Sequence, residues 1–410
     1  MKRRDFLGYA ATAGAMLLPF GREAWAASVP EAATQRKLIV IMLRGAVDGL
    51  SVVAPYADDN YYQLRPTIAV PRPGQENGAL DLDGYFGLNP VLSDLMPLWQ
   101  QRKLAFVHAS GSPDATRSHF DAQDYMESGT PGRKATQDGW MNRLLGGLPG
   151  PAVPTRAVSI GPLMPRILSG RAPASNIASG MAGTRTTLLD RPQIGQAFDQ
   201  LYQGDDQYSK AYKQAQETHQ EVMLAVDQDE MQKANNGAPL PNGFPDDAAR
   251  LAKLMRNDAN VQMAFLALGG WDTHANQGSV KGQLANHLQP LGQGLAVLAQ
   301  QLGPMFDDTT IVVMSEFGRT VKQNGNNGTD HGHGNAMWIL GGKVAGGKVY
   351  ADWQGLDESR LYERRDVPVT TDFRAVLAQV AERHLRLPDA RLQEIFPETW
   401  NRMGFNLLRT

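Results

Sequence analysis

Four clusters of polar side chains contain the residue types that bind divalent metals in proteins. Three of the eight histidines in the chain fall inside these clusters, each within three positions of a carboxylate. The chain has no cysteine, so imidazole nitrogen and carboxylate oxygen are the side-chain ligands available for a first-row metal. The clusters are Arg44–Gly49 (RGAVDG), Gly269–His274 (GGWDTH), Ser315–Arg319 (SEFGR) and Asn324–His333 (NGNNGTDHGH).

The spacing inside two clusters favours metal ligation. Asp272 and His274 are two residues apart, so on an extended segment their side chains point to the same side. His331 and His333 share a side in the same way, after Asp330 and between glycines that allow tight turns. Each cluster alone is also typical of a turn, a helix cap or a surface loop. The four together, close to strand ends, favour a metal site.

Short apolar runs rich in β-branched residues precede the clusters and predict buried strands. Three clusters directly follow such a run, and the fourth lies further along the last of these connections. Ligands of parallel α/β sheets bind outside the carboxyl ends of the strands, where these clusters would gather. The predicted strands are Leu38–Leu43, Leu104–His108, Ala157–Ile160, Met263–Leu268, Thr310–Met314 and Ala336–Leu340.

Helical patterns separate the runs, so the sequence predicts an α/β fold with a parallel sheet covered by helices. Pro97 is expected to kink or shorten the first of these helices. Residues 27–410 are predicted to form a single domain with a helical insertion near residues 165–250, and Asn235–Pro245 is predicted to be a loop. The predicted helices are Val91–Gln101, Tyr208–Lys233, Asp246–Met255 and Gly282–Leu302.

Residues 1–26 have the pattern of an export signal. Residues 2–4 are Lys-Arg-Arg, an apolar run covers residues 8–20, and residues 24–26 (Ala-Trp-Ala) form a cleavage site. Paired arginines followed by x-Phe-Leu indicate the twin-arginine variant rather than an ordinary secretory signal, so the twin-arginine translocase is an expected partner during export. The run is shorter than the ~20 apolar residues of a membrane span. We expect a periplasmic or secreted protein without a permanent membrane span.

Composition excludes several classes of protein. The 410 residues are 42% hydrophobic, which is ample for a packed core. Without cysteine the chain has no disulfide, iron–sulfur cluster or thiolate nucleophile. Forty basic and 42 acidic residues give a net charge of −2, so we expect no nucleic acid partner.

The motifs LRGAVDG, SHFDAQDYMESG, GGWDTH, SEFGRT and GTDHGHGN resemble those of the domain-of-unknown-function 1501 family. That family is similar to the alkaline phosphatase and sulfatase superfamily. The resemblance implies an α/β/α sandwich with a mainly parallel central sheet, and one or two divalent ions (Zn, Ca, Mg or Mn) at the strand ends. The metal ligands it implies are drawn from Asp48, Asp272, His274, Glu316, Asp330, His331 and His333.

The resemblance also implies a nucleophile at the start of a helix. The superfamily places it about ten residues before a glycine, and counting back from Gly129 falls on His119, beside Ser118. Thr116 is a further candidate. Free N–H groups at a helix N-terminus suit an anionic oxygen, but Ser118 is equally typical of a helix cap. Arg319, like Arg117, is a candidate for pairing with an oxyanion.

The sequence departs from the superfamily after the late strand, where Glu316-Phe317 stands in place of Asp-His. The favoured function is an exported metal-dependent hydrolase of phosphate, sulfate or related esters, with a small-molecule or polysaccharide substrate. Its predicted catalytic residues are Ser118, His119 and Arg319. The alternative is a non-catalytic periplasmic binding or assembly protein that retains the fold. For either function, we expect the metal ligands to converge at one edge of the sheet.

Overall fold

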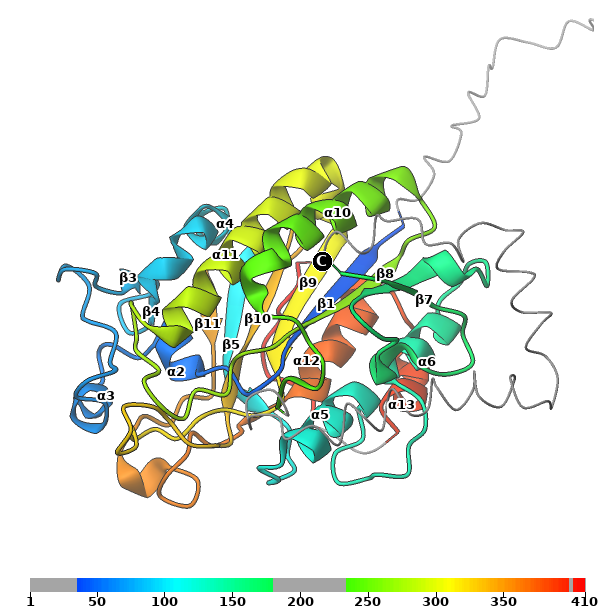
Figure 1. Ribbon diagram of the computed structural model, residues 1–410. Coiled ribbons are helices and arrows are strands. Elements are labelled where there is room, and N and C mark those ends of the chain that lie inside the picture. Colours follow the sequence, from blue (N-terminus) through cyan, green and yellow to red (C-terminus); the bar gives the residue numbers. More distant parts are fainter. Residues whose placement is uncertain (1–34, 180–233, 398–400, 410) are drawn as a thin grey trace, which may run out of the picture. The chain divides into compact units, whose positions relative to one another are not determined.

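A mixed β-sheet forms the centre of the part of the chain that the computed structural model describes, residues 35–179, 234–397 and 401–409 (Figure 1). In these residues nine strands form the sheet in the order β11-β5-β10-β9-β1-β8-β6-β7, with β12 also paired to β5. The strands are β1 (Lys37–Leu43), β5 (Leu104–Gly111), β6 (Ala157–Ile160), β7 (Ser175–Ile177), β8 (Met263–Leu268), β9 (Thr309–Ser315), β10 (Asn335–Gly341), β11 (Lys348–Tyr350) and β12 (Thr371–Asp372). All six predicted strands are thus confirmed as members of one sheet.

Strand β10 differs from its neighbours in direction. It pairs antiparallel with β5 and β9, whereas the other strand pairs of the sheet are parallel. Residues 316–334, which connect β9 to β10, therefore leave and re-enter the sheet at the same edge, the carboxyl edge of the parallel strands. The sequence predicted this strand but not its reversal.

Helices cover both faces of the sheet, which confirms the α/β sandwich. Along β1, alternate side chains pack into two hydrophobic clusters, one on each face. One cluster includes side chains of α4 (Met96–Gln100), α10 (Phe244–Asn257) and α11 (Gln283–Leu302). The other includes side chains of α6 (Trp140–Gly147), α12 (Phe373–Gln379) and α13 (Asp389–Ile395). All seven residues of β1 are buried.

Short elements complete the described residues. A small antiparallel sheet has the order β2-β4-β3, with β2 (Val53–Ala54), β4 (Gly87–Leu88) and β3 (Leu80–Asp81). The remaining α-helices are α2 (Gly49–Val52), α3 (Asp59–Leu64) and α5 (His119–Ser128). Short 3-10 helices are Pro90–Leu95, Pro154–Arg156, Arg166–Leu168, Pro241–Gly243, Gly303–Asp308 and Glu358–Arg360, and Val380–His384 forms a π-helix.

The predicted helices that fall in the described residues are present. Val91–Gln101 is divided into the segment Pro90–Leu95 and α4, with Pro97 in the first turn of α4, as its ring requires. Asp246–Met255 lies inside α10, and Gly282–Leu302 corresponds to α11. The signal, the predicted helix Tyr208–Lys233 and residues 180–233 of the predicted insertion lie outside the described residues. Among the described helices, none has the length and hydrophobicity that a membrane span requires.

A buried ion pair fastens the loop after β1 to α3. Asp48 Oδ2 lies 2.5 Å from Arg65 Nη1, and Asp48 Oδ1 lies 3.0 Å from Arg65 Nη2. Both side chains are shielded from solvent, and Arg65 also donates to the main-chain oxygens of Thr320 and Val321. Burial opposes ionisation of Asp48, but the charge of Arg65 lowers the pKa of this carboxyl overall. The pair therefore joins three loops at the carboxyl edge.

We expect Asp48→Asn to lower the free energy of unfolding by about 3–5 kcal/mol, because it leaves Arg65 as a buried charge without its partner. Denaturant unfolding monitored by circular dichroism measures this loss. The control is Glu358→Gln, which breaks an exposed pair in which Arg364 Nε lies 2.9 Å from Glu358 Oε1. That change should cost about 0–1 kcal/mol. Equal losses in the two variants would contradict a stabilising role for the Asp48–Arg65 pair.

Candidate metal centre

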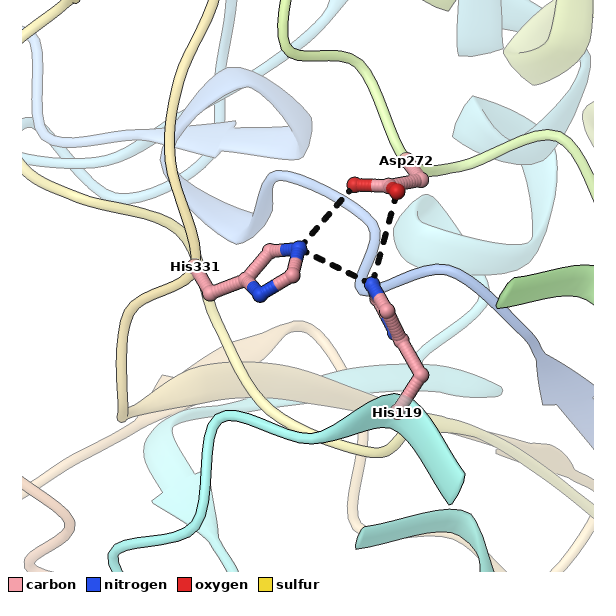
Figure 2. Close-up of side chains that lie close together, drawn as sticks. All are labelled: His119, Asp272 and His331. Carbon is pink, nitrogen blue, oxygen red and sulfur yellow. Dashed lines mark hydrogen bonds and ion pairs between the residues drawn. The ribbon is translucent and has the colours of Figure 1, made fainter. Parts of the chain in front are cut away.

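Three imidazole rings and one carboxylate converge at the carboxyl edge of the sheet. Ligand atoms of His119, Asp272 and His331 lie within 4.8 Å of one another (Figure 2). His119 Nε2 is 2.9 Å from His331 Nε2, and the two oxygens of Asp272 lie 3.3 Å from His331 Nε2 and 3.5 Å from His119 Nε2. His274 adjoins this group, because its Nε2 is 2.9 Å from both Asp272 Oδ1 and His331 Nε2.

The sheet places these side chains together although they are far apart in the sequence. His119 begins α5, which follows β5, and Asp272 and His274 lie in the loop after β8. His331 lies in the connection from β9 to β10, which the reversal of β10 returns to the carboxyl edge. The loops after parallel strands meet at that edge, so the convergence of Asp272, His274 and His331 follows from the topology.

The second nitrogen of each ring has an acceptor of its own. His119 Nδ1 lies 2.8 Å from Glu316 Oε1, and His274 Nδ1 lies 3.1 Å from Asp330 Oδ1. His331 Nδ1 lies 2.9 Å from the main-chain oxygen of Arg117. An acceptor at Nδ1 places the proton there and leaves a lone pair on Nε2.

When each ring is protonated on Nδ1 alone, as metal binding requires, three Nε2 lone pairs face one another beside the carboxylate of Asp272. Like lone pairs at such distances repel one another unless a cation or a shared proton lies between them. Metal-binding histidines characteristically donate their other N–H to a carboxylate or a main-chain carbonyl, which orients the ring. The donor set thus fits a divalent ion.

Arg319 positions Asp272 from behind. Its Nη2 lies 2.5 Å from Asp272 Oδ1, and its side chain is completely buried. Its other hydrogen bonds go to main-chain oxygens of three loops, those of Gly45, Ala46, Trp271 and Thr329. Arg319 was predicted to pair with an oxyanion; here its guanidinium holds a metal-ligand candidate and has no contact with solvent.

The two more buried histidines of the cluster, His119 and His331, differ in their proton affinity. Burial raises the pKa of Asp272, but hydrogen bonds with the three histidines and the charge of Arg319 lower it well below its usual range. Burial lowers the pKa of His119, but Asp272 and Glu316 together raise it to about 9. Burial lowers the pKa of His331, and the charge of Arg319 lowers it further. His119 therefore holds a proton at neutral pH when no metal displaces it.

Two of the carboxylates predicted as ligands instead hold imidazole rings. Glu316 accepts from Nδ1 of His119, and Asp330 accepts from Nδ1 of His274, so both stand one contact behind the converging Nε2 atoms. Asp48 is engaged by Arg65, as described above. These three carboxylates are at the correct edge of the sheet, but they do not face the cluster directly.

His333 packs against Tyr362 and is not among the residues of the cluster. Its ring packs against Tyr362 with ring centroids 4.5 Å apart, although it is two residues from His331. The peptide hydrogen bonds around it, from Gly318 N–H to the His333 oxygen and from Gly332 N–H to the Gly318 oxygen, hold this loop against the residues after β9. The expectation that His331 and His333 share a side rested on an extended segment, and the local turns of this loop separate them.

The predicted nucleophiles lie at the start of α5. Ser118 is the N-cap residue, with its Oγ 3.5 Å from Asp121 N, and the helix ends at Gly129, as predicted. Thr116 Oγ1 accepts from Ser118 N at 3.2 Å. In the described residues the hydrogen bonds of these two hydroxyls are thus local capping contacts. The guanidinium of Arg117 is paired with Glu363 and Asp366.

Gly45 is the point at which two of these loops touch. Its φ is +113°, and a Cβ at this position would lie 2.7 Å from Asp272 N. Its N–H donates to Glu316 Oε1 at 2.7 Å. Any larger residue here would push Asp272 away from the histidines, so the loop after β1 requires glycine at this position.

Sequence analysis placed His119 among the catalytic candidates and did not identify it as a ligand. The signal in the sequence that could have identified His119 as a ligand was its position directly after the helix cap Ser118, in SHFDAQD. Arg65 was missed, because nothing near it in the sequence marks it as the partner of Asp48.

We expect the affinity for Zn²⁺ to rise with pH between pH 7 and pH 9, because the metal must displace the proton of His119, whose pKa is about 9. One displaced proton corresponds to about a tenfold gain per pH unit, levelling off above pH 9. Competition with a chromophoric chelator at fixed ionic strength measures it. His119→Gln should bind Zn²⁺ more weakly, and its affinity should rise less steeply with pH, because the proton of His119 no longer has to be displaced. An affinity that does not change with pH would contradict a role for His119 as a ligand.

Solved structures similar to this chain include the following three. Ps i-CgsB in complex with a neocarrahexaose has a TM-score of 0.42 and 11% identity over 88% of this chain and 76% of that one. A protein in the alkaline phosphatase superfamily from Vibrio parahaemolyticus has a TM-score of 0.39 and 10% identity over 78% of this chain and 63% of that one. The zinc complex of the periplasmic domain of EptC from Escherichia coli has a TM-score of 0.37 and 11% identity, covering 76% and 74%.

Likenesses this loose assign neither a substrate nor a mechanism. No curated protein matches the chain. The sequence model of one family, described as Protein of unknown function (DUF1501), matches residues 99–396. That match covers well over half of the chain and includes His119, Asp272, His274 and His331, while the predicted RGAVDG cluster precedes it. The chain therefore belongs to the DUF1501 family of proteins of unknown function.

Proposed function

We propose that this protein is a metal-dependent hydrolase of phosphate, sulfate or related esters. One observation carries the proposal: the Nε2 atoms of His119, His274 and His331 converge on the carboxylate of Asp272, and every Nδ1 has an acceptor. Such a preorganised donor set at the strand ends of an α/β sheet is suited to holding an ion where a substrate binds.

The donor set favours zinc or a similar first-row ion over calcium or magnesium. Imidazole nitrogen suits Zn²⁺, whereas Ca²⁺ and Mg²⁺ prefer all-oxygen sites. We propose one ion rather than two, because Asp48, another of the predicted ligands, is paired with Arg65. When bound, the ion supplies Lewis-acid chemistry: it polarises an ester oxygen and activates water as a nucleophile.

The protein's own residues supply orientation and charge. Arg319 fixes the direction of the Asp272 carboxylate, and Glu316 and Asp330 fix two of the rings. His274 has the most exposed side chain of the three histidines, 36% against 24% for His331 and 10% for His119, so the substrate would approach from its side. The positive charge of a bound ion would suit an anionic ester.

We propose water as the attacking nucleophile. Ser118 and Thr116 use their oxygens to cap the start of α5, which supports a role for them in the helix rather than in attack.

A binding or assembly protein that retains the fold is the second candidate. It is favoured by the burial of Arg319, the predicted oxyanion partner, whose donors contact other parts of the protein. A binding protein would keep the metal and a ligand, but it would cleave no ester.

We also propose that residues 1–26 direct twin-arginine export to the periplasm or beyond. The support is the Lys-Arg-Arg segment, the short apolar run and the Ala-Trp-Ala site in the sequence.

We expect the purified mature protein, after loading with Zn²⁺ and dialysis, to contain about one Zn²⁺ per chain. A panel of p-nitrophenyl phosphate, phosphonate and sulfate esters then measures hydrolysis before and after chelation. Asp272→Asn and His331→Ala should lose both metal and hydrolysis, because each removes a ligand atom. His333→Gln is the matched control, since it changes a histidine of the same loop that lies outside the cluster, and it should retain both.

Ser118→Ala should retain metal and turnover and cost about 1 kcal/mol of stability through the lost helix cap. Loss of turnover with the metal retained would instead assign the attack to Ser118. Metal binding without cleavage of any ester in the panel would favour the binding protein.

Periplasmic protein should begin near Ala27, and Arg3→Lys/Arg4→Lys should block export, because the translocase recognises the paired arginines. Mass spectrometry of the periplasmic fraction gives the N-terminus, and immunoblotting of fractions measures export. Normal export of the double variant would contradict the twin-arginine route.

A further inference from the structure

Glu316 is a fully buried carboxylate whose oxygens are both engaged by protein donors. Oε1 lies 2.8 Å from His119 Nδ1 and accepts from Gly45 N at 2.7 Å and Gln123 Nε2 at 3.0 Å. Oε2 accepts from Ser315 Oγ at 3.1 Å. With three donors around one oxygen and a hydroxyl at the other, the carboxylate is oriented toward the back of the His119 ring.

We propose that Glu316 is the positioning residue of the metal centre: it fixes His119 with the proton on Nδ1 and the lone pair of Nε2 directed at the metal. This inference rests on the proposed function, since it requires His119 to be a ligand. It replaces the role implied by resemblance, in which Glu316 would itself bind the ion.

The other two rings have weaker outer contacts. His331 donates to a neutral main-chain oxygen, that of Arg117, and His274 contacts Asp330, whose side chain is 53% exposed. Water screens the charge of an exposed carboxylate, whereas a buried one acts at low dielectric. Of these three contacts, that of Glu316 should therefore strengthen metal binding by its histidine the most.

Glu316 also determines where the start of α5 lies. His119 and Gln123 are one helical turn apart on the same face of α5, and both contact the same carboxylate oxygen. Through Gly45 and Ser315 that carboxylate also holds the ends of β1 and β9. The helix start that carries His119 is thus fixed relative to two central strands by one side chain.

Glu127, a further turn along this face, offers a matched control. It is a buried glutamate whose Oε1 lies 2.6 Å from Arg44 Nη2, and it has no contact with the histidines. Both Glu316→Gln and Glu127→Gln remove a buried charge and preserve side-chain volume. In Glu316→Gln, the amide oxygen can still accept from His119, so ring orientation is retained while the charge is lost.

We expect Glu316→Gln to weaken Zn²⁺ binding by about 10–100-fold, the effect typical of losing an outer-shell partner. Competition with a chromophoric chelator measures the dissociation constant, and the visible spectrum of the Co²⁺-loaded protein reports the ligand field. Glu127→Gln should bind Zn²⁺ within about threefold of the wild type, because its contacts are independent of the site. Circular dichroism and thermal unfolding verify that both variants are folded.

A Glu316→Gln variant with wild-type Zn²⁺ affinity, in a protein whose His119→Ala variant has lost binding, would overturn the positioning role and leave the metal centre intact. If His119→Ala also binds as the wild type does, the metal centre itself is wrong.

A measurement without substitution of Glu316 covers the case in which that variant fails to fold. Nitrogen-15 spectra of the histidine rings in the Zn²⁺-loaded wild type, with His119 assigned by its absence in His119→Gln, should show the proton on Nδ1. A proton on Nε2 of His119 would overturn the proposal.

Discussion

The buried ion pair between Arg319 and Asp272 is the contact on which the site depends. Asp272 sits among three histidines, and Arg319 supplies a fixed, fully buried cation behind this carboxylate. Another residue could not easily replace Arg319, because the remaining donors of its guanidinium bind main-chain oxygens of the loops after β1, β8 and β9. One planar group thus contributes to keeping Asp272 charged and holds three loops together.

Two arginine–carboxylate pairs at the carboxyl edge of the sheet have different roles. Arg65 contacts both oxygens of Asp48, and Ser51 and Gln277 donate to one of them, which makes that corner a structural anchor. Arg319 satisfies one oxygen of Asp272 and leaves the other near His119. The same pairing with arginine therefore occupies both oxygens of Asp48 but leaves one oxygen of Asp272 free of arginine. The difference is that histidines surround Asp272, whereas further protein donors surround Asp48.

The sequence predicted the strands correctly, because continuous apolar runs such as those before Arg44 and Gly269 are compatible with few other structures. It located the loops of the candidate metal centre because parallel strands present their carboxyl ends at one edge. It could not assign Asp48, because the choice between a metal and Arg65 depends on how α3 packs. Nor could it separate His331 from His333, because turns within the loop decide which way each ring points.

The spacing of the candidate ligands along the chain has a consequence for the order of folding. His119 and His331 are 212 residues apart, and they meet after β5, β9 and β10 have paired. Contacts between such distant segments form late, because closing long loops costs entropy before native contacts repay it. A nascent chain would thus present no high-affinity assembly of imidazoles, and uptake of an ion would mark the completion of the sheet rather than start it.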